Sequence, residues 1–332
     1  MKKFKNQDKY PLFLSVVLVL HNQEKYIKKY LEDLIKILDL LVHNYEIIII
    51  DNASTDHSIH LLKALTSANG FSNLQIFGLT KYVDVETASW AGIENAIGDC
   101  ALVYDPALDD MSMIPTLVTS MQDGADVVFL KNNFIFPQSI PYKVFNYLFN
   151  SFFQFSVGIN FSDDVPMFRI LNRKLINFIS QYPKPALTYR YLPALAGFSK
   201  INLFYTYNVN AATKKKLLNY LGKGLLYTFS SSAKPMRIAT ILSLFCAFSN
   251  LLYSIYIITV SLFKQNVQPG WASLSLQQSG MFFLISLVLF ILSEYISQII
   301  FINHQGPSHN ISQEFRSTQM RFKEKINVDE SY

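Results

Sequence analysis

Two short acidic segments carry residue types that could bind a ligand with hydroxyl, amine or phosphate groups. Residues 51–56 read DNASTD, and residues 105–110 read DPALDD. Carboxylate and hydroxyl oxygens accept hydrogen bonds from sugar and base groups, and paired carboxylates supply the hard oxygen ligands that Mg²⁺ prefers. The first segment also has a structural interpretation, because Ser54 and Asp56 are good caps for a helix that follows.

Each acidic segment directly follows an apolar run that predicts a buried β-strand. The run before the first is Ile47–Ile50, and the run before the second is Cys100–Tyr104. Unbroken β-branched runs are typical of parallel strands that are covered by helices on both faces. In open α/β sheets the ligand crevice lies at the carboxyl ends of the strands, so we expect both segments to line one crevice.

The first 180 residues alternate predicted strands with predicted amphipathic helices, which indicates an α/β domain with a mostly parallel sheet. Further strands are expected at residues 13–20, 74–79 and 126–130, and helices at 25–42, 58–68, 87–96 and 114–121. A Phe- and Tyr-rich helix at 144–155, an extended segment at 168–173 and a helix at 175–179 complete the pattern.

The composition indicates a membrane portion late in the chain. Half of the residues are hydrophobic, with 27 Phe and 19 Tyr, and the mean hydropathy is positive. Residues 238–263 and 281–302 form apolar stretches that exceed the roughly 20 residues needed to cross a bilayer. Basic residues lie on the outer sides of this pair, which predicts two spans with both chain ends and the first domain in the cytoplasm.

The lysine cluster Lys214–Lys216 begins a leucine-rich segment that reaches Phe229. Lysines suit anionic headgroups and leucines suit the acyl boundary, so the segment is expected to be an interfacial helix, with an ordinary surface helix as the alternative. The tail from His304 is polar and is expected to be loosely ordered.

Several classes of protein are not favoured. The net charge of +5 is modest and comes with no recognisable nucleic-acid module, so nucleic acid is not an expected partner. Cys100 and Cys246 have neither metal-ligand spacing nor a disulfide pattern. The N-terminus has no sustained apolar segment of the kind found in signal peptides.

Six motifs in a fixed order extend over most of the chain. Residues 15–22 (SVVLVLHN) form a strand and turn, and residues 46–56 form a strand that ends in Asp51, Ser54 and Asp56. Residues 87–99 lead to the second acidic turn, and residues 168–173 read FRILNR. Residues 270–274 (GWASL) and 293–296 (SEYI) come last. This set resembles the polyprenyl-phosphate glycosyltransferases of glycosyltransferase family 2.

The resemblance implies a GT-A-like nucleotide-binding domain, interfacial helices and two transmembrane helices. It divides the chain into a cytoplasmic domain (1–205), interfacial helices (206–236), a two-helix transmembrane domain (237–303) and a cytoplasmic tail (304–332). It also implies site residues: Asn22, Asp51, Ser54, Asp56 and Lys81 for the nucleotide sugar, Asp105 and Asp109 for Mg²⁺ or Mn²⁺, Asp110 near the acceptor, and Arg169 and Arg173, with Lys214–Lys216, for phosphate. Relatives with two spans imply a homo-oligomer.

The second acidic turn departs from the family pattern. The family has Asp-x-Asp-Leu-Gln-Asp, and here Ala107 stands at the second aspartate while Asp109 replaces the glutamine. Loss of a carboxylate weakens a cation site unless another oxygen takes over, which Asp109 could do. The alternative is a degenerate turn that holds no metal.

These expectations define a membrane glycosyltransferase that moves a sugar from a nucleotide donor, UDP- rather than GDP-linked, onto a polyprenyl phosphate for cell-envelope glycan synthesis or modification. One alternative is a non-catalytic relative that binds the nucleotide sugar or the lipid carrier and supports a partner in glycan assembly. Another is an enzyme that uses a different acceptor.

Overall fold

The computed structural model describes residues 9–106, 108–133, 140–159, 165–182, 184–207 and 309–319, with isolated positions between 245 and 299. The chain forms two compact units. Unit 1 comprises residues 1–143, 159–214 and 306–332, and unit 2 comprises residues 144–158 and 215–305. Both acidic turns belong to unit 1.

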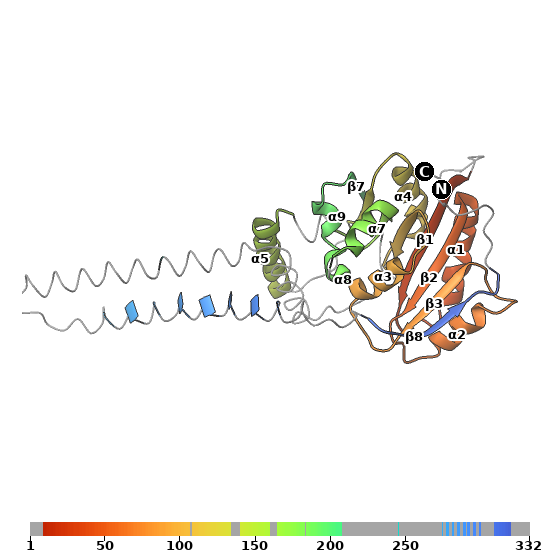
Figure 1. The fold of residues 1–332 in the computed structure, drawn as a ribbon, viewed down its shortest axis with the longest axis horizontal. Coiled ribbons are helices and arrows are strands. Elements are labelled where there is room, and N and C mark those ends of the chain that lie inside the picture. The colour runs from red at the N-terminus through yellow and green to blue at the C-terminus, as the bar shows by residue number, and fades with distance from the viewer. Residues whose placement is uncertain are drawn as a thin grey trace, which may run out of the picture. The chain divides into compact units, whose positions relative to one another are not determined.

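The described part of unit 1 is built on one eight-stranded sheet with the order β7-β5-β6-β4-β1-β2-β3-β8 (Figure 1). The strands are β1 (Tyr10–Leu20), β2 (Val42–Asp51), β3 (Leu74–Leu79), β4 (Cys100–Tyr104), β5 (Val127–Asn132), β6 (Arg169–Asn172), β7 (Lys200–Tyr205) and β8 (Ile311–Arg316). Four pairings are parallel, β1–β2, β1–β4, β2–β3 and β5–β7. The other three, β3–β8, β4–β6 and β5–β6, are antiparallel. The predicted α/β domain with a mostly parallel sheet is confirmed.

Helices cover both faces of this sheet. They are α1 (Ile27–Leu41), α2 (Ser58–Leu65), α3 (Val85–Glu94), α4 (Ile114–Gln122), α7 (Arg173–Ser180), α8 (Pro185–Thr188) and α9 (Leu192–Leu195), with a short 3₁₀ helix, η1 (Met111–Met113). Most of α5 (Ile140–Val157) belongs to unit 2. Every strand and helix that the sequence predicts up to residue 180 is present, with ends shifted by a few residues.

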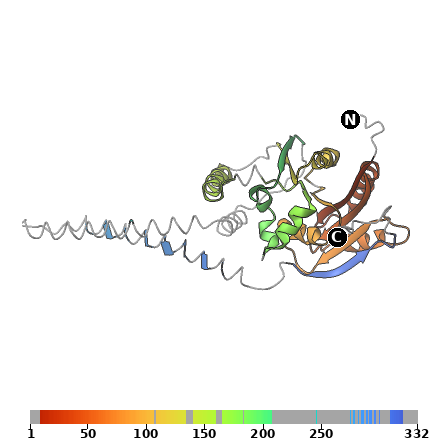
Figure 2. The same ribbon diagram turned by 45° about the horizontal axis from the view of Figure 1, so that its top comes forward.

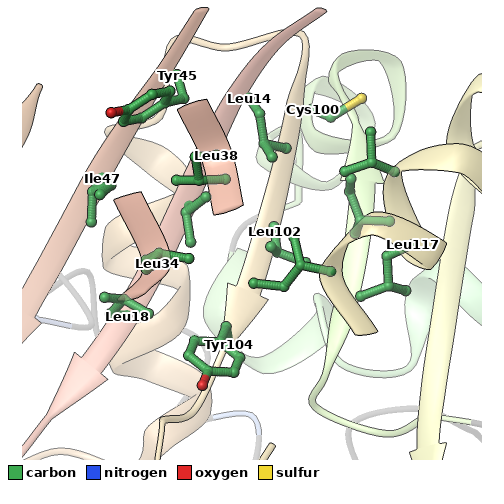
Figure 3. Packing of buried hydrophobic residues seen from close by; sticks show 14 of the residues in the cluster. Leu14, Leu18, Leu34, Leu38, Tyr45, Ile47, Cys100, Leu102, Tyr104 and Leu117 are labelled. Carbon is green, nitrogen blue, oxygen red and sulfur yellow. The ribbon is translucent and has the colours of Figure 1, made fainter. Parts of the chain in front are cut away.

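One face of the sheet packs against α1, α2 and α4 in a single apolar cluster. Leu31, Leu34 and Leu38 follow helical spacing along α1 and are fully buried. Figure 3 shows Leu34 beside Leu18 of β1, with Leu38 farther along the helix. Because side chains alternate along a strand, Val17 of β1 points to the opposite face, where α3 packs.

The sequence pattern does not reveal β7 and β8. β8 pairs antiparallel with β3 and extends the sheet at its edge (Figure 2). Ser317 fixes this return: its Oγ donates to the carbonyl of Phe71 at 2.6 Å and accepts the N–H of Leu74 at 3.2 Å. The expectation of a loosely ordered tail is therefore wrong for residues 311–316, which form a strand of the sheet.

The predicted spans, residues 238–263 and 281–302, and the lysine-rich segment from Lys214 to Phe229 lie outside the described residues, apart from isolated positions. Within the described part of the chain, no helix combines the length and apolar character that a membrane crossing requires. The spans and the four-segment division of the chain stay predictions.

Gly92 brings α3 close to the sheet, and we predict that Gly92→Ala destabilises the protein. A Cβ at this position would lie 2.3 Å from Cγ1 of Val17. Overpacking of this kind costs about 1–3 kcal/mol, which urea denaturation measures as a lower midpoint. Gly78→Ala is the matched control, because its Cβ would meet Ile59 at an ordinary 3.4 Å. If Val17→Ala in the same chain recovers none of the stability lost in Gly92→Ala, this close contact is not the cause.

Candidate active site

The two acidic turns flank the point at which the strand order changes direction. β2 and β3 lie on one side of β1, and β4 lies on the other. The parallel strands β1, β2 and β4 end at Leu20, Asp51 and Tyr104. In open α/β sheets, ligands bind beyond the carboxyl ends of the strands at such a switch point. The sheet therefore brings both predicted segments to the edge at which a ligand crevice is expected.

The turns after β1 and β2 are joined by hydrogen bonds. The N–H of Asn22 donates to Ser54 Oγ at 2.9 Å, and the N–H of Thr55 donates to Asn22 Oδ1 at 2.8 Å. Asn22 and Ala53 have positive φ angles of 55° and 52°, a conformation that costs energy in a residue other than glycine. The structure thus brings Asn22 and Ser54 together, and each fixes the backbone of the opposite turn.

Asp56 makes a capping contact with the helix that follows it, which is the structural alternative that the sequence suggests. Its Oδ1 accepts the N–H of Ser58, the first residue of α2, at 3.0 Å. Its Oδ2 accepts the N–H of Glu24 in the turn after β1, at 3.3 Å. The Asp56 carboxylate therefore starts α2 and tethers the two turns, so its predicted contact with a nucleotide is not needed to explain it.

Asp51 differs from its neighbours in the turn. Its side chain lies at the end of β2 and is only 4% exposed. Oδ2 accepts the N–H of Ser54 at 3.2 Å, whereas Oδ1 is buried and has no hydrogen-bond partner among the described residues. A buried carboxylate oxygen without a donor is costly. An N–H or O–H group of a ligand would remove that cost.

The residues that hold the backbone next to Asp51 in place were not predicted as site residues from the sequence. The side-chain amide of Asn52 donates to the carbonyl of Val83 at 2.8 Å and accepts the N–H of Val83 at 2.9 Å. A ring nitrogen of His21, Nδ1, lies 2.9 Å from the carbonyl of Asn52, and the His21 ring meets Tyr82 edge to face at 4.9 Å. The loop between β3 and α3 is thereby tied to the end of β2. The sequence feature that could have identified Asn52 was its position within the acidic motif, directly after Asp51.

The second acidic turn is closed by its own carboxylate. Asp109 Oδ2 accepts the N–H of Asp105 at 2.9 Å, and Oδ1 accepts the hydroxyl of Tyr205 at 3.4 Å. Burial, together with the nearby Asp105 carboxylate, raises the pKa of Asp109 to about 7. Burial and the charge of Asp109 also raise the pKa of Tyr104 and of Tyr205. Tyr205 comes from the unpredicted strand β7, so sequence reasoning could not find it.

The carboxylates of Asp109 and Asp110 in this turn are occupied by contacts within the protein. Both oxygens of Asp109 accept hydrogen bonds from groups of the protein. Asp110 Oδ1 accepts the N–H of Ser112 and caps η1. Among the described residues no group of three or more His, Cys, Asp or Glu could hold a metal ion. Ala107 lies outside the described residues, and the Mg²⁺ or Mn²⁺ ligands stay a prediction.

The pKa of Asp109 predicts how the pH changes stability. Because the native pKa is raised from 3.8 to about 7, the folded state holds a proton between these values that the unfolded state has released. The contribution of Asp109 to the free energy of unfolding therefore falls as the pH rises from about 4 to about 7. Asp109→Asn keeps an oxygen for the Asp105 amide and cannot ionise. Its stability relative to the parent protein, measured by urea denaturation, is expected to increase from pH 4.5 to pH 8. A difference that is constant with pH would contradict this.

Arg169 is a buried structural residue. Its side chain is fully buried, and its guanidinium donates to the carbonyls of Val165, Pro166, Tyr189 and Arg190. It also lies 5.0 Å from the Phe129 ring centre and 5.4 Å from that of Tyr189. Backbone carbonyls therefore occupy the guanidinium group that was predicted to bind phosphate, and these contacts do not support that predicted role.

Arg173 lies at the opposite end of β4 from the acidic turn. Its backbone N–H donates to Asp99, and its guanidinium donates to the carbonyls of Ala96 and Gly98, just before β4 begins. The predicted role at the phosphate is therefore not supported by its position. Lys81 is exposed and follows β3 by two residues, at the same sheet edge as Asp51.

Comparisons with known proteins agree with this architecture. Residues 15–179, which include both acidic turns, match the family model Glycosyl transferase family 2. The uncharacterized glycosyltransferase YkcC of Bacillus subtilis is 24% identical over 291 residues, 86% of this chain and 88% of its own. The bactoprenol glucosyl transferase of Shigella phage SfV is 25% identical over 324 residues, 91% and 98% of the two chains.

A solved structure of the mannosyltransferase PcManGT from Pyrobaculum calidifontis, in complex with GDP-Man and Mn²⁺, has a TM-score of 0.45 and 14% identity. It covers 89% of this chain and 91% of that one. On the matched segment and these relatives, the chain belongs to glycosyl transferase family 2.

Proposed function

We propose that this glycosyltransferase moves a sugar from a nucleotide-sugar donor, UDP- rather than GDP-linked, to a polyprenyl phosphate at the cytoplasmic face of a membrane. The observation that carries the proposal is the buried Oδ1 of Asp51, which lacks a hydrogen-bond donor in the described part of the chain and lies at the switch point of the sheet. A nucleoside base supplies an N–H group of the kind that this oxygen would accept.

The chain's own residues would act mainly by positioning. Asp51 would hold the nucleoside, while Asn22 and Ser54 keep the turns around it in place. A phosphate acceptor is already an anion and needs little help from a general base. Holding it against the donor sugar would therefore provide most of the rate enhancement.

The acceptor is proposed from a relative and from the composition. The relative in Shigella phage SfV is named for bactoprenol and aligns along 91% of this chain. That alignment covers much more of this chain than the matched family segment, which ends at residue 179, before the two apolar stretches. These features support a lipid-linked acceptor for cell-envelope glycan synthesis or modification. The homo-oligomer remains a prediction.

A surface of α5 supports the membrane role. Val144, Tyr147, Leu148, Phe152 and Phe155 are exposed and follow the spacing of one helix face. The described residues of this face carry no acidic group, and from Val144 onward α5 belongs to the same compact unit as residues 215–305. An exposed aromatic stripe of this kind suits a bilayer interface. After alkaline carbonate washing of cell membranes, the protein is expected to stay with the lipid, and its release would contradict the two spans.

A non-catalytic protein that binds the nucleotide sugar or the lipid carrier is the second candidate. The closed turn favours it, because both carboxylate oxygens of Asp109 are used within the protein and Ala107 replaces an aspartate. An enzyme with another acceptor is the third.

Transfer of labelled sugar to lipid separates these three possibilities. The purified full chain would be placed in vesicles containing undecaprenyl phosphate and supplied with labelled UDP- or GDP-sugars, with and without Mg²⁺ or Mn²⁺. Label in the lipid extract is expected for a UDP-sugar. Label in a water-soluble or glycan product only would indicate a different acceptor. No transfer from any donor would favour the non-catalytic protein.

A further inference from the structure

Glu86 and Arg190 form an ion pair that was not predicted from the sequence. Arg190 Nη1 lies 2.6 Å from Glu86 Oε1, and the two side chains are only 17% and 8% exposed. Glu86 is in the first turn of α3, and Arg190 follows α8. Desolvating two charges offsets most of the attraction between them, so a buried pair is weak evidence of a role in stability. The location of the pair, between two segments that border the crevice, better explains its presence.

One end of the pair is fixed to the nucleoside side of the crevice. Asn52, next to Asp51, holds the backbone of Val83 through two hydrogen bonds. Asp84 then caps α3 by accepting the N–H of Thr87 at 2.9 Å. The first turn of α3, which contains Glu86, is therefore tied to the end of β2.

The other end of the pair is fixed to the side of the crevice that carries the second acidic turn, residues 105–110. Arg190 Nε donates to the carbonyl of Val165 at 3.1 Å, and the carbonyl of Arg190 accepts from Arg169 at 2.8 Å. The backbone of Arg169 pairs with Val103 of β4, two residues before Asp105. The Tyr189 ring packs against Trp90 of α3, with 5.9 Å between ring centres. The segment around Arg190 is therefore tied to the end of β4.

We infer that the Glu86–Arg190 pair is a positioning device that holds the first turn of α3, on the Asp51 side of the crevice, against the segment around Arg190, on the Asp105 side. The pair closes a ring of contacts that runs from β2 through α3 to β6 and β4. The nucleoside would bind on one side of this ring and the reacting end of the donor on the other. A displacement of about 1 Å between reacting groups can cost roughly 100-fold in rate. The inference rests on the proposed function.

The test compares Glu86→Gln with Arg190→Lys in the full chain in undecaprenyl phosphate vesicles. Glu86→Gln keeps the shape and removes the charge, and Arg190→Lys keeps the charge but lacks the fork that reaches both Glu86 and Val165. For Glu86→Gln we expect kcat for sugar transfer to fall at least 10-fold while the Kd for UDP stays within twofold. Arg190→Lys should lose less. The matched control is Asp33→Asn, which breaks the exposed Asp33–Lys36 pair and should leave kcat unchanged.

Thermal unfolding separates positioning from plain stability. If Glu86→Gln lowers the melting temperature but, below that temperature, transfers sugar with the parent kcat, the pair is structural and the inference is overturned. If the variant does not fold, Arg190→Lys decides by the same comparison. A parent protein that binds UDP but transfers sugar from no donor would overturn the proposed function, and the inference with it.

Discussion

Replacing Asp51 by alanine is expected to weaken the binding of UDP and UDP-sugars by about 10- to 100-fold. A hydrogen bond to a charged group contributes about 1.5–3 kcal/mol, and Oδ1 of Asp51 is the buried oxygen that would receive it. Asp51→Asn keeps an oxygen for the N–H of Ser54 but presents an amide donor to the ligand. We expect it to bind UDP as poorly as the alanine variant. Titration calorimetry measures both constants.

The stability of Asp51→Asn is the second part of this prediction. The exchange removes a buried carboxylate oxygen that has no partner among the described residues, so the melting temperature is expected to stay the same or rise. Lost binding with retained stability is the signature of a ligand-binding residue. Asp33→Asn on the exposed face of α1 is the control for the change of charge. If Asp51→Asn binds UDP as tightly as the parent, the nucleoside does not contact Asp51.

Replacing Arg169 by methionine is expected to cause the largest loss of stability. Four carbonyls would lose a charged donor at once. Each buried polar group left unsatisfied costs about 1–3 kcal/mol, so we expect the free energy of unfolding to fall by at least about 3 kcal/mol. Urea denaturation measures this loss. Arg173→Met is the matched control, because its guanidinium donates to two carbonyls at the opposite sheet edge and the loss should be smaller.

Arg169→Lys distinguishes this structural role from phosphate binding. A lysine keeps the charge but cannot reach four carbonyls, so we expect reduced stability in this variant as well. A variant with the parent's melting temperature and no turnover would contradict the structural role and restore the original prediction of a phosphate ligand.

The fold of unit 1 was largely predictable because its central strands are buried on both faces. β3 and β4 have the predicted ends: β4 is an unbroken apolar run that stops at Asp105, and β3 is mostly apolar and stops at Thr80. β8 could not be predicted, because its residues are mostly exposed and its partner β3 lies more than 200 residues earlier in the chain. Such an edge strand depends on a tertiary pairing that leaves little local signal.

The site was predictable where it depends on strand ends. Asp51, Asn22 and Ser54 come together because parallel strands end at the same edge of a sheet. Arg169 and Arg173 lie close together in the sequence, but β6 runs antiparallel to β4 and carries them toward opposite edges. The partner of Asp109, Tyr205, belongs to a strand that the pattern missed. The spacing of the motifs in the sequence predicts neither the direction of β6 nor the burial of the Arg169 side chain.

The release of nucleoside diphosphate tests the central claim, that the crevice at the ends of β1, β2 and β4 carries out sugar transfer. It would be measured with the purified full chain in vesicles, with and without undecaprenyl phosphate, for the parent, Asp51→Ala and Asp105→Ala. We predict release from a UDP-sugar that requires the lipid, falls about 10- to 100-fold in Asp51→Ala at donor concentrations below KM, and is lost in Asp105→Ala. Tight UDP binding by the parent without release from any donor would contradict the claim and favour the non-catalytic protein.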